Sequence, residues 1–193
     1  MPPHCDGLGP MRLFTAIDLP GEVLRNLEDL LVKLRPTALI NWSPTANLHI
    51  TTKFIGEWPE ARLEELMTAL ADLAPRPAIP VEIRRVGFFP NPHSPRVFWC
   101  GIEAPGLAGL AADTDKAASA LGISSEARAF SPHLTLARIK ERLDLQPLRE
   151  AVAALSSLDF GRFNARSFFL YQSRLRPTGS VYTKLREYPF AQP

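Results

Sequence analysis

The chain has 193 residues, of which 46% are hydrophobic and 22% are charged, a balance that is ordinary for a folded globular protein. Its formal net charge of +2 is too small to predict strong non-specific binding to nucleic acid, so any recognition of phosphate must come from a local group of residues. The two cysteines provide neither a disulfide framework nor a metal knuckle. No apolar run is long enough for a membrane span, and the N-terminus lacks the basic and then apolar pattern of a signal peptide, so we expect a cytoplasmic protein.

The sequence of the N-terminal half predicts an extension, then two strands that are each followed by a helix, and then a hairpin. Residues 1–10 are rich in proline and glycine and lack a periodic apolar pattern, which predicts a flexible extension. Apolar residues at helical spacing predict two helices, each preceded by a strand, and a proline-rich loop joins the two strands of the hairpin. The expected strands are 12–18, 48–55 (closed by Gly56), 79–89 and 96–102, and the expected helices are 22–34 and 60–73.

The C-terminal half predicts two more helices and three more strands. The helices are expected at 107–121, where Gly122 provides a cap, and at 145–155. The strands are expected at 132–139, 159–174 and 181–188. This order predicts an α+β protein in which residues 11–190 form one domain of two pseudo-symmetric lobes, each a mostly antiparallel sheet with helices packed outside.

Two copies of one motif stand out, in NLHITTKFIGE (47–57) and PHLTLARIKE (132–141). Each contains a histidine, an aliphatic residue and a threonine, and the second copy follows 84 positions after the first. Successive side chains of a strand point to opposite faces, so His49 and Thr51 share one face, as do His133 and Thr135. One such triplet is weak evidence, but two within similar segments indicate a duplicated site.

Paired histidines suit general acid-base chemistry, because an unperturbed imidazole titrates near pH 6.5 and both protonation states are available at neutral pH. The threonine hydroxyls could hydrogen-bond phosphoryl oxygens as negative charge builds on them. Arg138 is the best phosphate partner near the motifs, although in a regular strand it would face away from Thr135 unless a bulge turned it round.

Other catalytic arrangements are disfavoured. Neither motif supplies a second ligand on the same face, which argues against a metal site, and no nucleophile elbow, GxGxxG or P-loop pattern occurs. The remaining histidines, His4 and His93, lie in proline-rich loops and are expected to be bystanders. Several aromatic and basic residues could line a nucleotide site, although core packing and solvated surface are the default expectations: Trp42, Phe54, Phe88, Phe89, Phe163, Lys53, Arg84, Arg85, Arg174, Arg176 and Lys184.

The two motifs resemble those of the two-histidine phosphoesterases, and their flanks narrow the match. MRLFTAIDLP near the start and YQSRLRPTGSVYTKL near the end are similar to segments of the RNA 2′,3′-cyclic phosphodiesterases, also called 2′-5′ RNA ligases. The similarity covers about residues 11–190. Thr52 departs from the family pattern, which commonly has an aliphatic residue there, but it is expected on the face away from the histidines.

The resemblance implies a fold with the histidine strands facing each other across a central cleft, and hydrolysis of a terminal 2′,3′-cyclic phosphate to a 2′-phosphomonoester without metal or cofactor. It implies His49 as the acid and His133 as the base, with Thr51, Thr135 and Arg138 holding phosphoryl oxygens. The expected partner is an RNA end carrying the cyclic phosphate, bound by a monomer with no membrane or obligate protein partner. Two alternatives stay open: 2′-5′ joining of RNA ends, and a non-catalytic RNA or nucleotide binder.

Overall fold

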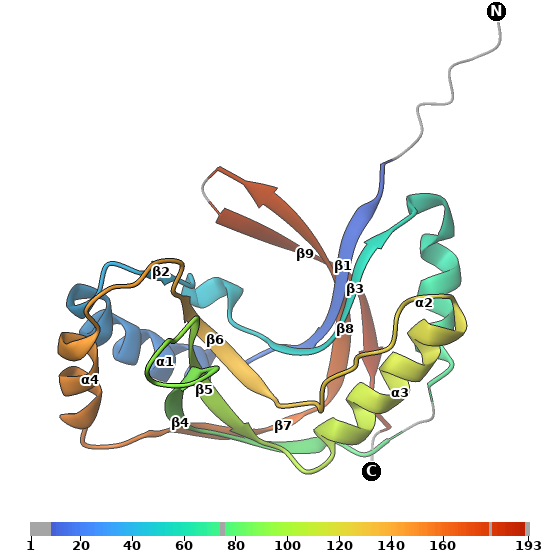
Figure 1. Cartoon of the computed structure of the whole chain (residues 1–193). Helices are drawn as coiled ribbons and strands as arrows, with labels where there is room; N and C mark the ends of the chain where they lie inside the picture. The colour runs from blue at the N-terminus through green and yellow to red at the C-terminus, as the bar shows by residue number, and fades with distance from the viewer. Residues whose placement is uncertain (1–8, 74–75, 178, 192–193) are drawn as a thin grey trace, which may run out of the picture.

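The structure is a computed structural model that describes residues 9–73, 76–177 and 179–191 (Figure 1). The extension predicted over residues 1–10 therefore lies outside the described residues except for Gly9 and Pro10, which are exposed. Within the described ranges, no helix is long and apolar enough to cross a membrane.

Within these described ranges, the fold consists of two antiparallel sheets and four α-helices. Sheet A has the strand order β3-β1-β8-β9 and sheet B the order β2-β6-β5-β4-β7. This confirms the predicted α+β class, with one histidine motif in each sheet. The elements in chain order are β1 (Met11–Ile17), α1 (Gly21–Leu34), β2 (Asn41–Trp42), β3 (Ile50–Trp58), α2 (Leu63–Ala71), β4 (Ile79–Phe89), β5 (Val97–Glu103), α3 (Leu107–Ala120), β6 (His133–Arg138), α4 (Gln146–Ala153), β7 (Asp159–Ala165), β8 (Ser167–Arg176) and β9 (Gly179–Pro189).

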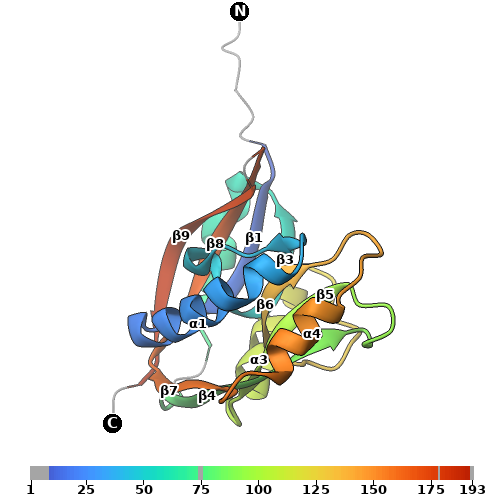
Figure 2. The same ribbon diagram turned by 90° about the vertical axis from the view of Figure 1, so that its left-hand side faces the viewer.

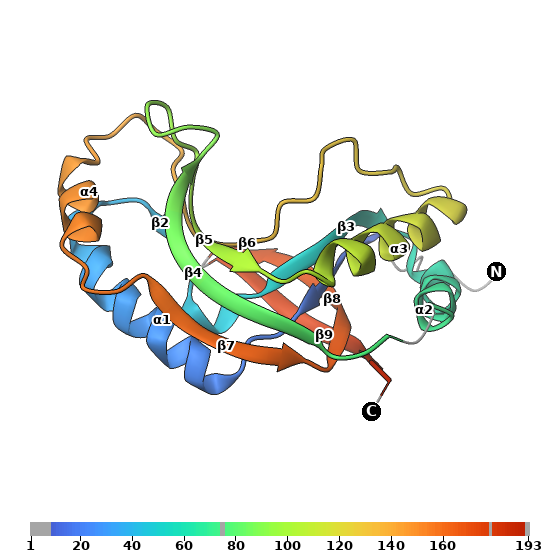
Figure 3. The same cartoon turned by 90° about the horizontal axis from the view of Figure 1, so that it is seen from below.

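The helices cover one face of each sheet. Helix α1 buries Val23, Leu27 and Leu31 and packs on β7, where a Cβ at Gly161 would come within 3.2 Å of the Val23 side chain. Helix α3 packs on β3 in sheet A. Figures 2 and 3 show α1 and α4 together at one end of the molecule, and Figure 3 shows α2 and α3 together at the other. A single hydrophobic cluster contains buried residues of both sheets, among them Leu13 of β1 and Phe98 of β5.

Two predicted strands differ from the structure by more than two residues at an end. The strand predicted at 159–174 was wrong as one element, because it divides at Arg166 into β7 in sheet B and β8 in sheet A. The carbonyl of Arg166 accepts a hydrogen bond from the backbone N–H of Phe190, a residue that belongs to neither β7 nor β8. The backbone at Arg166 therefore pairs with neither neighbouring strand and separates the two elements. Gly56 does not close β3. It has a φ of +82°, a conformation that glycine adopts without strain, and the strand continues to Trp58.

Candidate active site

The two motif histidines are held in the same way at the beginning of their strands. Nδ1 of His49 lies 2.7 Å from the carbonyl oxygen of Asn47, and Nδ1 of His133 lies 2.8 Å from that of Ser131. A carbonyl can only accept a hydrogen bond, so Nδ1 carries the proton in both rings. In the neutral rings Nε2 is therefore the unprotonated nitrogen, and it is the atom that can exchange a proton with a substrate.

The structure brings the two motifs together, because β3 and β6 contact each other although they belong to different sheets. Ser43, in the segment that leads to His49, links the motifs further. Its backbone N–H donates to the carbonyl of Leu136 at 2.8 Å, and its hydroxyl donates to the carbonyl of Thr135 at 2.7 Å. The segment that precedes the first motif is thus hydrogen-bonded directly to β6, the strand of the second motif.

A β-bulge recurs in both motif strands at the same place. Thr52 in β3 is skipped in the pairing with β1, and Leu136, 84 positions later, is skipped in the pairing of β6 with β5. Each bulge inserts one residue and so reverses the alternation of faces beyond it. Thr52 itself is buried and shares a hydrogen bond of 2.7 Å with the hydroxyl of Thr15, which agrees with its expected packing role.

The bulge turns Arg138 to the histidine side of sheet B. Opposite residues in an antiparallel pair share a face, and β5 pairs Gly101 with His133, Trp99 with Thr135 and Val97 with Arg138. The exposed guanidinium of Arg138 therefore belongs to the same face as His133 and Thr135, which we call the His133 face. A strand without the bulge would have pointed it into the core.

Phe54 occupies the position in β3 that corresponds to Arg138 in β6. It follows the Thr52 bulge by two residues, pairs with Phe14 of β1, and is 59% exposed. The duplicated motif is thus chemically asymmetric, because one copy ends in a cation and the other in an aromatic ring. Sheet B is the better side for an anion.

His49 is enclosed by aromatic rings, whereas His133 is exposed. The ring of Phe14 stacks on His49 at a centroid distance of 4.7 Å, and Tyr182 of β9 meets it edge-on at 5.1 Å. Burial lowers the pKa of His49 below the ordinary value for histidine, because it penalises the charged ring. The hydrogen bond to Asn47 and the negative charge of Asp18 oppose this shift in pKa.

Asp18 lies in a polar cluster beside these rings. It accepts a hydrogen bond from the hydroxyl of Tyr171 and pairs with Lys184 at 2.6 Å. The rings of Phe14, His49 and Tyr171 form a triangle, with centroid distances of 4.7 Å from Phe14 to His49, 5.3 Å from Phe14 to Tyr171 and 6.4 Å from His49 to Tyr171. No sequence pattern singles out Phe14, Asp18, Tyr171 or Tyr182. The only signal for them was that all four lie in the terminal segments that carried the family resemblance.

The β8–β9 hairpin reaches back to the first motif. The side-chain amide of Asn47 donates to the carbonyl of Ser180 at 2.8 Å, and Tyr182 packs on His49. Sheet A places β3 and β9 at opposite edges, so these contacts show that the hairpin curls over the sheet. Figure 1 shows this end of the hairpin standing away from the rest of sheet A.

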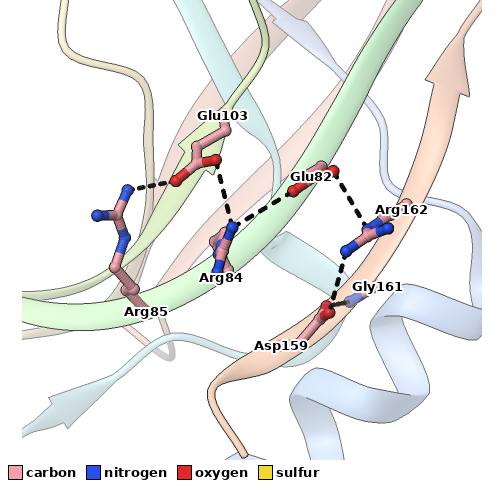
Figure 4. Close-up of polar contacts among 7 residues, drawn as sticks. All are labelled: Glu82, Arg84, Arg85, Glu103, Asp159, Gly161 and Arg162. Carbon is pink, nitrogen blue, oxygen red and sulfur yellow. Dashed lines mark hydrogen bonds and ion pairs between the residues drawn. The ribbon is translucent and has the colours of Figure 1, made fainter.

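The charged residues of β4, β5 and β7 form a compensated network (Figure 4). Arg84 lies 3.7 Å from Glu82 and 3.6 Å from Glu103, Arg85 pairs with Glu103, and Arg162 bridges Glu82 and Asp159. Three arginines thus face three carboxylates. Arg84 pairs with Gly101 and so shares the His133 face, but its charge is already neutralised by its neighbours.

Several of the residues that could have lined a nucleotide site lie elsewhere. Lys53 is only 4% exposed and pairs with Asp115 of α3 at 2.6 Å, so it cannot line the site. Trp42 packs edge-on against Phe98 in the core, and Phe88 packs against the same ring in a tilted arrangement. Among the described residues, no group of three or more His, Cys, Asp or Glu side chains is placed to hold a metal ion. The metal-free reaction stays a prediction.

Comparison with known proteins places this site in a family. The family model described as LigT like Phosphoesterase matches residues 17–99 and 102–182. An RNA 2′,3′-cyclic phosphodiesterase of Methanocaldococcus jannaschii is 34% identical over 178 residues, covering 92% of this chain and 100% of that protein. One of Thermus thermophilus is 35% identical over 188 residues, covering 92% of this chain and 89% of that protein.

Solved structures agree with this relationship. The crystal structure of TT0787 of Thermus thermophilus has a TM-score of 0.78 at 32% identity, covering 93% of this chain and 98% of that one. The crystal structure of E. coli LigT complexed with 3′-AMP has a TM-score of 0.77 at 28% identity, covering 95% of this chain and 99% of that one. Because the family model and these relatives span most of the sequence, the chain belongs to the LigT-like phosphoesterase family.

Proposed function

We propose that this protein hydrolyses the terminal 2′,3′-cyclic phosphate of RNA to a 2′-phosphomonoester, with His49 and His133 as an acid-base pair and without a metal. One observation carries the proposal: two histidines on contacting strands, each with Nδ1 bonded to a backbone carbonyl and Nε2 left for proton transfer. The names of the relatives described above support the substrate class. Both histidines come from one chain, which supports a monomer as the active form.

In the proposed reaction, Nε2 of His133 removes a proton from water while the water oxygen attacks phosphorus. The bond between phosphorus and the 3′ oxygen breaks, and Nε2 of His49 gives its proton to that oxygen. Thr51, Thr135 and Arg138 hold the non-bridging oxygens, where hydroxyl and guanidinium donors stabilise developing charge. Exposed His133 has access to water, in keeping with the role of base.

The role of acid requires a protonated His49, although burial lowers the pKa of this ring. An anionic cyclic phosphate beside the ring would raise that pKa, as the charge of Asp18 already does in part. We therefore propose that His49 takes up its proton together with the substrate.

The test is to incubate the protein, in EDTA, with a short RNA that ends in a 2′,3′-cyclic phosphate and to identify the product by mass and phosphate position. We expect a 2′-phosphomonoester. His49→Ala and His133→Ala should each lower the rate by about 100-fold to 10,000-fold, the usual effect of one acid-base group. His93→Ala is the matched control, because His93 is exposed and lies in the loop between β4 and β5.

Full activity in the double histidine variant would contradict the proposal. Tight binding of unchanged RNA that survives both replacements would instead identify a binding module. Joining of a 5′-hydroxyl RNA to the cyclic end, under the same conditions, would identify the ligase activity.

A further inference from the structure

Trp99 lies beside the proposed phosphate-binding residues of sheet B. It pairs with Thr135, between the pairs Gly101–His133 and Val97–Arg138, so its side chain belongs to the His133 face. Neighbouring strands are about 4.8 Å apart. The Trp99 backbone on β5 is therefore one strand spacing from Thr135 on β6, and its indole extends from β5 over Gly87 of β4, between one and two spacings from Thr135.

The indole of Trp99 lies flat on the sheet. A Cβ built at Gly87 would be 2.4 Å from Cζ2 of Trp99 and 2.8 and 2.9 Å from Cε2 and Cη2, the ring atoms bonded to it. Because these three distances are similar, this Cβ lies over the face of the ring. If it approached the ring edge at Cζ2, the atoms Cε2 and Cη2 would be much farther from it. A Cβ at Gly101 would be 3.3 Å from Cζ3 of the same ring and 2.7 Å from the carbonyl oxygen of Arg84. The indole therefore requires glycine at position 87, whereas at Gly101 the Arg84 carbonyl is the closer obstacle, and the other face of the indole points away from the sheet.

The other two tryptophans have structural partners that Trp99 lacks. The indole N–H of Trp42 donates to Ala38 at 3.0 Å, and that of Trp58 donates to Arg62 at 2.9 Å, whose guanidinium also covers the Trp58 ring. Among the described residues, Trp99 has no hydrogen-bond, stacking or cation–π partner of this kind, and it is partly exposed. A flat, partly open indole beside a phosphate site is suited to stacking on another ring.

We propose that the outward face of Trp99 is the stacking surface for the nucleobase of the terminal nucleotide. This inference rests on the proposed function, because it places the base one ribose ring away from the phosphate held by Thr135 and Arg138. Every base has an aromatic face, so stacking on Trp99 recognises a base with little preference for its identity.

The neighbouring charges favour a terminal nucleotide over a longer tract. On the next strand, Arg84 is neutralised by Glu82 and Glu103, so this part of the His133 face offers no free cation to a second phosphate (Figure 4). The other side chains of this face are the indole, Val97, Phe89 and the residues of the second motif. Together they fit one base, one ribose and one phosphate.

The experiment compares two substrates that differ only in the base: adenosine 2′,3′-cyclic phosphate and methyl ribofuranoside 2,3-cyclic phosphate. In Trp99→Ala, we expect kcat/KM for the adenosine ester to fall about 10-fold to 100-fold more than kcat/KM for the base-free ester, the range expected for one lost stack. Trp99→Phe should show a smaller difference. Gly87→Ala should act like Trp99→Ala, because the new methyl group displaces the indole.

Gly109→Ala is the matched control, because Gly109 is exposed on α3 and a Cβ there meets nothing within 4 Å. Equal losses on both substrates in Trp99→Ala and Trp99→Phe would overturn the stacking proposal. If the unmodified protein hydrolyses neither these esters nor the short RNA with a cyclic end, the proposed function fails, and binding of adenosine 2′-phosphate against ribose 2-phosphate decides the inference separately. A preference for the adenosine ligand that Trp99→Ala abolishes supports stacking, whereas one that persists overturns it.

Discussion

The two motif histidines share one backbone contact but differ in their surroundings. Each donates from Nδ1 to the carbonyl two residues earlier, so the orientation of the rings repeats. His49 is then enclosed by Phe14 and Tyr182, whereas His133 is exposed. Duplicated sequence has thus produced two groups with different electrostatic environments, which is the usual basis for separate acid and base roles.

At the residue scale, we predict that Asp18→Asn lowers the pKa of His49 further. The negative charge of Asp18 favours the imidazolium and so raises the pKa of His49. Removing this charge leaves the lowering of the pKa by burial with less to counteract it. If His49 is the acid, kcat/KM is lost as pH rises through its pKa, and the alkaline limb of the pH profile should move to lower pH in this variant. NMR titration of the histidine Cε1 protons measures the shift directly, with exposed His93 as an internal reference. An unchanged or raised pKa would show that Asp18 does not act on His49.

At the element scale, the first motif strand is fixed to α3 by a buried ion pair. The side chain of Lys53, 3% exposed, lies 2.6 Å from Asp115, whose side chain is 25% exposed, and its ammonium also donates to the carbonyl of Ser124 at 2.8 Å. The hydrogen bond from Lys53 is the main reason that the pKa of Asp115 is lowered. Lys53 lies on the face of β3 opposite to His49. Its ion pair with α3 therefore fixes the orientation of the first motif.

We predict that Asp115→Ala destabilises the fold by about 3 kcal/mol, because it leaves the ammonium of Lys53 buried without its partner. Asp113→Ala is the control on the same helix. Asp113 pairs with Arg76, but its side chain is 50% exposed, so its loss should cost about 1 kcal/mol or less. Urea unfolding at pH 7 measures both. Because the pKa of Asp115 is lowered on folding, the stability from this pair should be present above about pH 4 and lost as pH falls further. Equal, small effects of the two replacements would contradict this account.

At the scale of the whole molecule, the two sheets draw their strands from both halves of the chain. Sheet A joins β1 and β3 to β8 and β9 from the C-terminus, while sheet B contains β4 and β5 from the middle of the sequence. The two histidine motifs therefore do not belong to sequential N-terminal and C-terminal lobes. Each sheet depends on segments distant in sequence, and the shared hydrophobic cluster couples them.

We predict that a chain ending at Ala165 loses cooperative folding although it keeps both motifs. It lacks β8, which pairs with β1 and buries Phe168 and Leu170, so sheet A would be reduced to the pair β1–β3. An isolated two-stranded unit is marginally stable in water. A chain ending at Ala191 retains every strand and is the control. Thermal unfolding followed by circular dichroism distinguishes them, and a cooperative transition in the shorter chain would show that the sheets fold independently.

The sequence by itself determined the helices, most strands and the duplicated motif. The helices and strands follow from local periodicity, and the motif follows from the repeat of His, aliphatic residue and Thr. It also indicated Arg138 as the nearest cation, but it left the direction of that side chain open. The bulge at Leu136 decided the direction, because a bulge is defined by how two strands pair and not by one strand alone. For the same reason the division of residues 159–174 between two sheets was missed.

Only the tertiary structure decided what surrounds the motifs. Phe14, Asp18 and Tyr182 reach His49 through the sheet and the curled hairpin, and Trp99 lies flat because Gly87 on the neighbouring strand leaves room for it. Lys53, which from its charge alone could have faced a phosphate, is buried against α3. Periodicity specifies which face of an element is apolar, whereas the neighbours of a side chain depend on contacts between residues far apart in the chain.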